Sequence, residues 1–282
     1  MQKKSQLIDI RRYSVLRGIF RYFILILLIF YAAAAYAQKM DEPLGKKKDG
    51  IVYIPIIYYT PETKIAGGAS VIYYYRNPNS SINSRPSTIQ PLLIYTHNKQ
   101  TISQITFDNY WRNGNYHSRL ETTYKEYPDK FYGIGNDTPE SIEEDYTSHI
   151  THLEMNFQKR LQHALYFGIQ YEYQHNKIVE VAENGLLAKG DIFGSEGGLA
   201  SGAGFLMSFD TRDNIFYPSS GVNYQLSANR FSNSLGSDFT FSRYTLDLRN
   251  YFSLFSSHVL ALQGYMNILQ GQVPFQLMSQ VG

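Results

Sequence analysis

The sequence contains no cysteine and only one tryptophan among its 282 residues. Without cysteine there is no disulfide framework, no thiolate metal site and no cysteine nucleophile. Beyond residue 37 there is also no run of about 20 apolar residues, the length that a helix needs to span a membrane. Charged residues make up 18% of the chain and hydrophobic residues 43%, which excludes a disordered polymer and a bundle of membrane helices. Tyrosine is the abundant residue, with 25 copies beside 17 phenylalanines.

The N-terminal region has the three parts of a secretory signal. Six basic residues are followed by an apolar run from Tyr22 to Ala34, and then by Ala35-Tyr36-Ala37. We therefore expect a signal peptide over residues 1–37, cleaved between Ala37 and Gln38. A membrane helix is the alternative, but the run is shorter than ~20 residues and ends in small residues. Cleavage removes six of 26 basic residues and one of 24 acidic residues, leaving a net charge of −3, which argues against nucleic acid as a partner.

The rest of the chain alternates apolar and polar residues with a period of two. Leu246 and Leu248, for example, alternate with Thr245, Asp247 and Arg249. Because successive side chains of a strand point to opposite faces, such a segment has one apolar and one polar face. The pattern recurs in residues 105–111, 116–125, 152–158, 165–174 and 222–229, with Asn109 as a polar exception on an apolar face.

Two architectures share this alternation. A soluble β-sandwich buries its apolar face, whereas a membrane β-barrel turns that face to lipid and its polar face to a wet lumen. The barrel is favoured because the segments are ~10–14 residues long, against ~5–6 in soluble sheets. Aromatic residues also flank the apolar faces, as in interfacial girdles, and charged residues lie in mid-strand. The fold class that we predict is all-β, a transmembrane antiparallel β-barrel.

About eleven strands are expected. They cover residues 51–60, 66–76, 88–98, 101–111, 115–127, 147–160, 163–177, 198–210, 220–231, 239–254 and 257–268. Tight connections alternate with long ones, like the short periplasmic turns and longer outer loops of such barrels. Residues 38–50 are expected to form a short periplasmic segment, which is too short for a folded domain. Residues 51–282 then form the outer-membrane barrel domain, incomplete at its C-terminal end.

A distinctive motif lies between two of these strands. It consists of Asp210, Arg212 and Asp213, followed by Phe216, Tyr217, Pro218 and Gly221. The motif resembles one of the bacterial surface antigen family, the barrel domain of outer-membrane assembly factors of the BamA and TamA type. In that family an acidic–basic–acidic run ends a strand and an aromatic-Pro-x-x-Gly turn opens the next. The segment Ile54–Thr63 also resembles the first strand and hairpin of the family, and Phe131–Asn136 resembles a loop of members that lack periplasmic domains.

The resemblance implies a fold and a role. Family barrels are sixteen-stranded, so the chain resembles a member that lacks periplasmic POTRA domains and whose last strands would follow Gly282. The implied function is insertion or translocation of proteins at the cell outer membrane, by a monomer without a cofactor. The implied partners are outer-membrane lipid and client outer-membrane or surface proteins. A passive channel for solutes is the alternative, and a barrel enzyme is the third hypothesis.

The motif residues admit a functional and a structural interpretation. Asp210, Arg212 and Asp213 are either a functional ion cluster or a polar hairpin at the membrane surface. We favour the hairpin, with exposed ion pairs that contribute little. Pro218 and Gly221 are most simply turn residues.

Other candidate chemistry has weaker support in the sequence. The glycines between Gly190 and Gly204 precede a strand, whereas a phosphate cradle needs a following helix. Only His152 and Glu154 share a strand face as a histidine–carboxylate pair, which is insufficient for a metal site. None of the seven histidines has a serine two positions later, the arrangement that would put both on one strand face for catalysis. We therefore expect no catalytic, metal or cofactor-binding residues.

Overall fold

The computed structural model describes residues 48–60, 63–77, 84–135, 138, 142–255 and 258–279. The chain divides into two compact units, residues 1–46 and 47–282, and every described residue belongs to the second. The expected signal peptide, its cleavage site between Ala37 and Gln38, and residues 38–47 therefore lie outside the described residues. Within the described part, no helix is long and apolar enough to cross a membrane.

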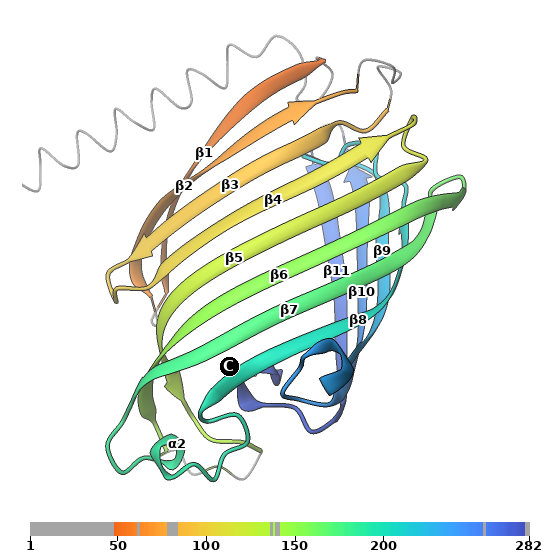
Figure 1. Cartoon of the computed structure of the whole chain (residues 1–282). Coiled ribbons are helices and arrows are strands. Elements are labelled where there is room, and N and C mark those ends of the chain that lie inside the picture. The colour runs from red at the N-terminus through yellow and green to blue at the C-terminus, as the bar shows by residue number, and fades with distance from the viewer. Residues whose placement is uncertain are drawn as a thin grey trace, which may run out of the picture. The chain divides into compact units, whose positions relative to one another are not determined.

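In the described part of the chain, eleven antiparallel strands form one sheet whose spatial order follows the sequence (Figure 1). The number and placement of the strands confirm the prediction. They are β1 (Asp49–Thr60), β2 (Lys64–Tyr75), β3 (Ser87–Thr96), β4 (Thr101–Trp111), β5 (Tyr116–Phe131), β6 (Glu144–Gln162), β7 (Leu165–Val181), β8 (Gly197–Asp210), β9 (Gly221–Phe231), β10 (Phe241–Leu254) and β11 (His258–Gly271).

Seven strands are longer than the sequence predicts, and the three longest are neighbours in the sheet. β5, β6 and β7 contain 16, 19 and 17 residues. The residues added to β5 and β6 include Asp129-Lys130 and Glu144-Asp145, which are polar on both faces, whereas β7 adds Ile178-Val179-Glu180-Val181, with apolar residues on both faces. None of these additions alternates apolar and polar residues with a period of two. Pairing with one another extends them, for example between Lys130 and Asp145.

The sheet has two ends, which we name by their connections. The motif end carries the connections β2–β3, β4–β5, β6–β7, β8–β9 and β10–β11, and the loop end carries the others. At the motif end, Asn113 and Gly114 both have positive φ in the tight β4–β5 turn, as the sequence suggests. The loop end holds a short helix that was not predicted, α2 (Leu186–Lys189), and the 3₁₀ turn η1 (Asn233–Leu235).

After β11 the chain turns back over the loop end. The 3₁₀ turn η2 (Phe275–Leu277) inserts Phe275 between Phe131 and Tyr146, with ring centroids 5.3 and 5.7 Å apart. Val273 and Leu277 pack against Phe231 and Phe241 in a second apolar cluster. The cluster around Phe275 and the cluster around Phe231 are both small, and they hold the segment after β11 against the connections at the loop end.

The inner face of the sheet is polar and the outer face is apolar, the opposite of the arrangement in a soluble protein. Side chains such as Gln158 and Asn176 are fully buried on the inner face, whereas Tyr53, Ile169 and Phe205 are more than half exposed on the outer face. The sandwich alternative requires the apolar face to be buried. The distribution therefore fits the wall of a barrel with a polar interior.

Candidate functional site

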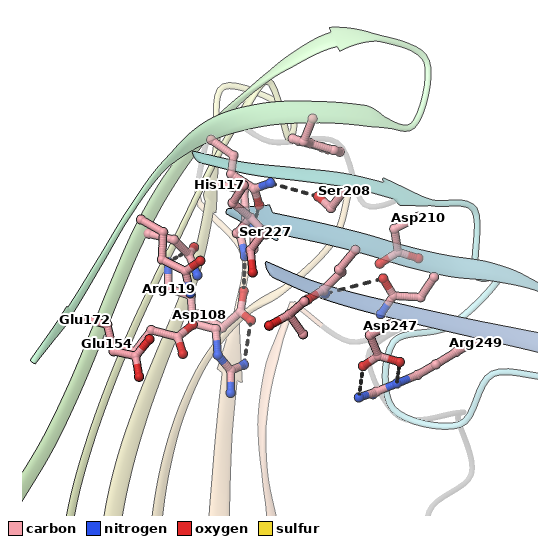
Figure 2. A pocket seen from close by; sticks show the side chains of 18 of the residues that line it. Asp108, His117, Arg119, Glu154, Glu172, Ser208, Asp210, Ser227, Asp247 and Arg249 are labelled. Atoms are coloured by element: carbon pink, nitrogen blue, oxygen red, sulfur yellow. Dashed lines mark hydrogen bonds and ion pairs between the residues drawn. The ribbon is translucent and has the colours of Figure 1, made fainter. Parts of the chain in front are cut away.

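The inner face of the curved sheet encloses a polar cavity of about 790 Å³. Among the described residues, five arginines and five acidic residues line it, and Figure 2 shows the acidic side chains with those of Arg119 and Arg249 around the same space. Several lining charges come from the polar positions of the alternating segments, including Asp108, Glu172 and Arg249, as the pattern predicts, whereas Arg85 and Arg212 come from connections between strands. A second cavity of about 620 Å³ lies toward the loop end and shares His152, Gln174, Gln276 and Met278 with the first.

On β4 and β5, one carboxylate organises the nearest charges. Asp108 Oδ1 lies 2.8 Å from His117 Nε2, and Asp108 Oδ2 lies 3.4 Å from Arg119. Arg119 Nη2 also donates to Glu121 Oε2 at 2.7 Å. His117 Nδ1 lies 3.1 Å from the Gln158 amide oxygen, which orients the imidazole from its other side. The imidazole is thus held in a network, and no hydrogen bond between it and a serine is found among the described residues.

Three glutamates form a row across neighbouring strands. Glu121 on β5 faces Glu154 on β6, which faces Glu172 on β7. Like charges directly opposite one another repel, so the row requires compensation. Arg119 pairs with Glu121, and Arg243 pairs with Glu172 at 2.5 Å. Among the described residues, no hydrogen bond to the central Glu154 is found.

A buried ion cluster joins two distant connections at the motif end. Arg85, in the β2–β3 connection, donates to Asp210 Oδ2 at 2.6 Å and to the Asp210 carbonyl at 2.7 Å. Arg212 donates to the same carboxylate at 3.0 and 2.8 Å. Burial lowers the pKa of Arg85, but attraction to Tyr110 and Asp210 outweighs it and raises that pKa. Tyr74 and Phe216 contact each other between the same connections, with centroids 5.7 Å apart.

This cluster corrects one expectation. Asp210 was expected in an exposed ion pair, yet it is only 8% exposed. The reason is the curvature of the sheet, which brings Arg85 from the β2–β3 connection onto the end of β8. Sequence reasoning missed Arg85 because nothing near it in the chain marks a partner 125 residues away.

The remaining motif residues build the β8–β9 connection. The exposed Asp213 carboxylate accepts hydrogen bonds from the Ser219 hydroxyl and from the backbone N–H groups of Asn214, Ser219 and Ser220. Slight burial raises the pKa of Asp213, but these hydrogen bonds outweigh it, so the pKa lies below its ordinary value. Tyr217 and Pro218 lie in this connection, and Gly221 opens β9 with φ 97°.

The weaker candidates are placed as follows. Gly190 ends α2, Gly197 begins β8, and Gly202 and Gly204 lie within β8, so a strand follows the glycines. His152 and Glu154 both line the cavity, but His152 Nε2 lies 3.6 Å from Glu172. In the described part of the chain, no three histidine or carboxylate side chains are grouped to hold a metal ion.

Comparison with known proteins gives a family and a fold. A family model described as the Omp85 superfamily domain matches residues 93–278. Among solved structures, BamA from Haemophilus ducreyi lacking POTRA domains 1–3 is similar, with a TM-score of 0.53 and 14% sequence identity. That match covers 83% of this chain and 44% of the other, so the chain spans less than half of that structure. No curated protein matches the sequence.

Proposed function

The chain belongs to the Omp85 superfamily, and on that premise we propose that it acts at the outer membrane in the insertion or translocation of other proteins. The observation that carries the proposal is the reversed sheet, polar inside and apolar outside. Its partners are then outer-membrane lipid on the outer face and client outer-membrane or surface proteins. The motif residues Asp210, Arg212, Asp213, Phe216, Tyr217, Pro218 and Gly221 act structurally in this proposal, by shaping the hairpin between β8 and β9.

The outer face supports contact with lipid. Strands such as β3, with 10 residues, and β4, with 11, match the length that crosses a bilayer when tilted. Trp111, Tyr116 and Phe157 cluster on the outer face, with ring centroids 5.9–6.1 Å apart. Such aromatic clusters suit the membrane–water interface, where amphipathic rings are favoured.

The edge of β1 supports a role in handling polypeptides. All twelve residues of β1 pair with β2 without interruption, although Pro55 lacks a backbone N–H. The missing donor of Pro55 therefore faces away from β2, on the edge that has no partner among the described residues. An edge strand with a proline pairs weakly with any neighbour. We infer that contacts along this edge open readily, which suits the entry of a client strand.

Depletion of the protein in its own cell tests the proposal. We expect unfolded client barrels or surface proteins to accumulate in the periplasm, and their outer-membrane levels to fall. Unchanged levels of every outer-membrane protein after complete depletion would contradict a role in insertion or translocation.

A passive channel is the second candidate, favoured by the charged cavity of about 790 Å³. Conductance of the purified protein in a planar bilayer separates the two. A channel gives a steady conductance. Its ion selectivity should change in Glu154→Gln, which removes the charge of the central glutamate of the row. An insertion factor shows client accumulation on depletion without such steady conductance.

A further inference from the structure

A proline interrupts the pairing between β2 and β3. Pro91 lies in β3, a central strand that has β2 on one side and β4 on the other. Proline in a central strand removes a ladder hydrogen bond and is normally confined to edges and bulges. The register shows the loss: β2 and β3 pair from Ala66 to Ser70 and again from Tyr73 to Tyr75, but not at Val71 and Ile72.

The missing bond can be assigned to the β2 side of Pro91. The pairing of β3 with β4 continues through Pro91 and Ile105. The register with β2 does not shift across the gap, so the interruption is the loss of a donor and not a bulge. The carbonyl of Val71, which faces Pro91, consequently lacks a ladder donor from β3.

Side chains bridge this gap only in part. The Ser70 hydroxyl donates to the Pro91 carbonyl at 3.0 Å, and the Gln90 amide donates to the Ser70 hydroxyl at 3.1 Å. On one side of the gap, β2 presents the small residues Gly67, Gly68 and Ala69 to β3, whereas Tyr73, Tyr74 and Tyr75 pair with β3 on the other side. Small side chains bury little area against the neighbouring strand, so the stretch of the border at Gly67–Ala69 depends largely on its backbone bonds.

The hairpin on the other side of this border is continuous. β1 and β2 pair over twelve consecutive positions, from Asp49 with Tyr75 to Thr60 with Lys64. We propose that the β1–β2 hairpin moves as one unit relative to β3. The sheet then bends or separates at the border between β2 and β3, next to Pro91. The proposal rests on the sheet alone, so it holds whether the protein inserts clients or conducts solutes.

Pairs of spin labels on the full-length chain in outer-membrane vesicles test the proposal. The chain has no cysteine, so single replacements carry the labels cleanly. Ile57 on β1, Leu93 on β3 and Ile169 on β7 suit labelling because they are exposed to a similar extent, 58, 58 and 59%. We expect the distance distribution between labels at Ile57 and Ile169 to be broader than that between labels at Leu93 and Ile169.

The variant Pro91→Val restores the missing donor and provides the matched control. It should narrow the Ile57–Ile169 distribution to the width of the Leu93–Ile169 distribution and leave the latter unchanged. Equal widths in the unmodified protein would overturn the proposal, and so would a broad distribution at Leu93, because β3 would then move with the hairpin. The comparison in the unmodified protein decides the matter even where Pro91→Val fails to fold.

Discussion

Arg243 Nη1 donates a hydrogen bond to Glu172 Oε1 at 2.5 Å, although β8 and β9 lie between their strands. The Arg243 guanidinium lies 5.1 Å from the centre of the Phe231 ring, which covers Gly202 of β8. A glycine at this position leaves room for the ring and for the arginine that crosses it. The ion pair thereby links β10 to β7 over the inner face and helps to hold the curvature of the wall.

The glycines of β8 should not tolerate a side chain. A Cβ at Gly202 would lie 2.6 Å from the Phe231 ring, and one at Gly204 would lie 1.9 Å from the Ala228 carbonyl oxygen. We expect Gly202→Ala and Gly204→Ala each to lower the free energy of unfolding by about 1–3 kcal/mol, because the neighbouring atoms must shift. Urea titration of the protein in lipid vesicles measures the effect.

Gly264→Ala is the matched control, since no atom lies within 4 Å of a Cβ at that position in β11. Its effect should stay within about 0.5 kcal/mol. A similar loss of stability in all three variants would show that the close contacts at Gly202 and Gly204 do not determine the effect.

Removing different members of the ion cluster at the motif end should lower the stability of the protein by different amounts. Asp210→Ala leaves the partly buried Arg85 and Arg212 without their carboxylate, which should cost about 2–4 kcal/mol of unfolding free energy. Arg85→Ala should cost less, because Arg212 still pairs with Asp210 at 2.8 Å. Arg249→Ala is the control, because Arg249 is 42% exposed and its pair with Asp247 should contribute less than about 1 kcal/mol. Urea titrations measure the three stability losses. If Arg249→Ala lowered the stability most and Asp210→Ala least, the cluster would have no stabilising role.

The strands and their facing could be predicted from the sequence, whereas contacts across the cavity could not. Alternation around Leu246 and Leu248 specifies a strand and its apolar face, because side-chain direction depends only on the local backbone. The pairs Arg85–Asp210 and Arg243–Glu172 depend on how strongly the sheet curves, which no local pattern encodes. For the same reason Asp210 was expected to be exposed and is buried.

Acidification should loosen the β8–β9 connection. The pKa of Asp213 is lowered by hydrogen bonds that its carboxylate accepts in the fold, so its contribution is present above the ordinary pKa of about 3.9 and is lost as the pH falls through the lowered value. Hydrogen exchange of residues 211–220 should therefore accelerate, relative to the intrinsic rate, as the pH is taken below about 4. In Asp213→Asn this additional acceleration should disappear. An identical pH profile in both proteins would show that Asp213 does not hold the connection.

Charge on the outer face should be far more costly than charge on the inner face. Leu248→Arg should make folding into lipid less favourable by about 2–4 kcal/mol if the site lies near the bilayer midplane. Thr245→Arg, on the same strand, should have a mild effect because Thr245 lines the wet cavity. Folding titrations into lipid vesicles measure both. Equal penalties would point to a soluble core or to a different register.

Cysteine accessibility along β10 tests most directly that the chain forms a membrane wall with a wet inner face. Single replacements at Thr245, Leu246, Asp247 and Leu248 are made in the cysteine-free chain and probed in intact outer membranes. The account predicts that a water-soluble maleimide labels the positions of Thr245 and Asp247. A fluorophore at the positions of Leu246 and Leu248 should instead be quenched by spin-labelled lipid. Water-soluble labelling of all four positions, or no quenching by lipid at any of them, would contradict it.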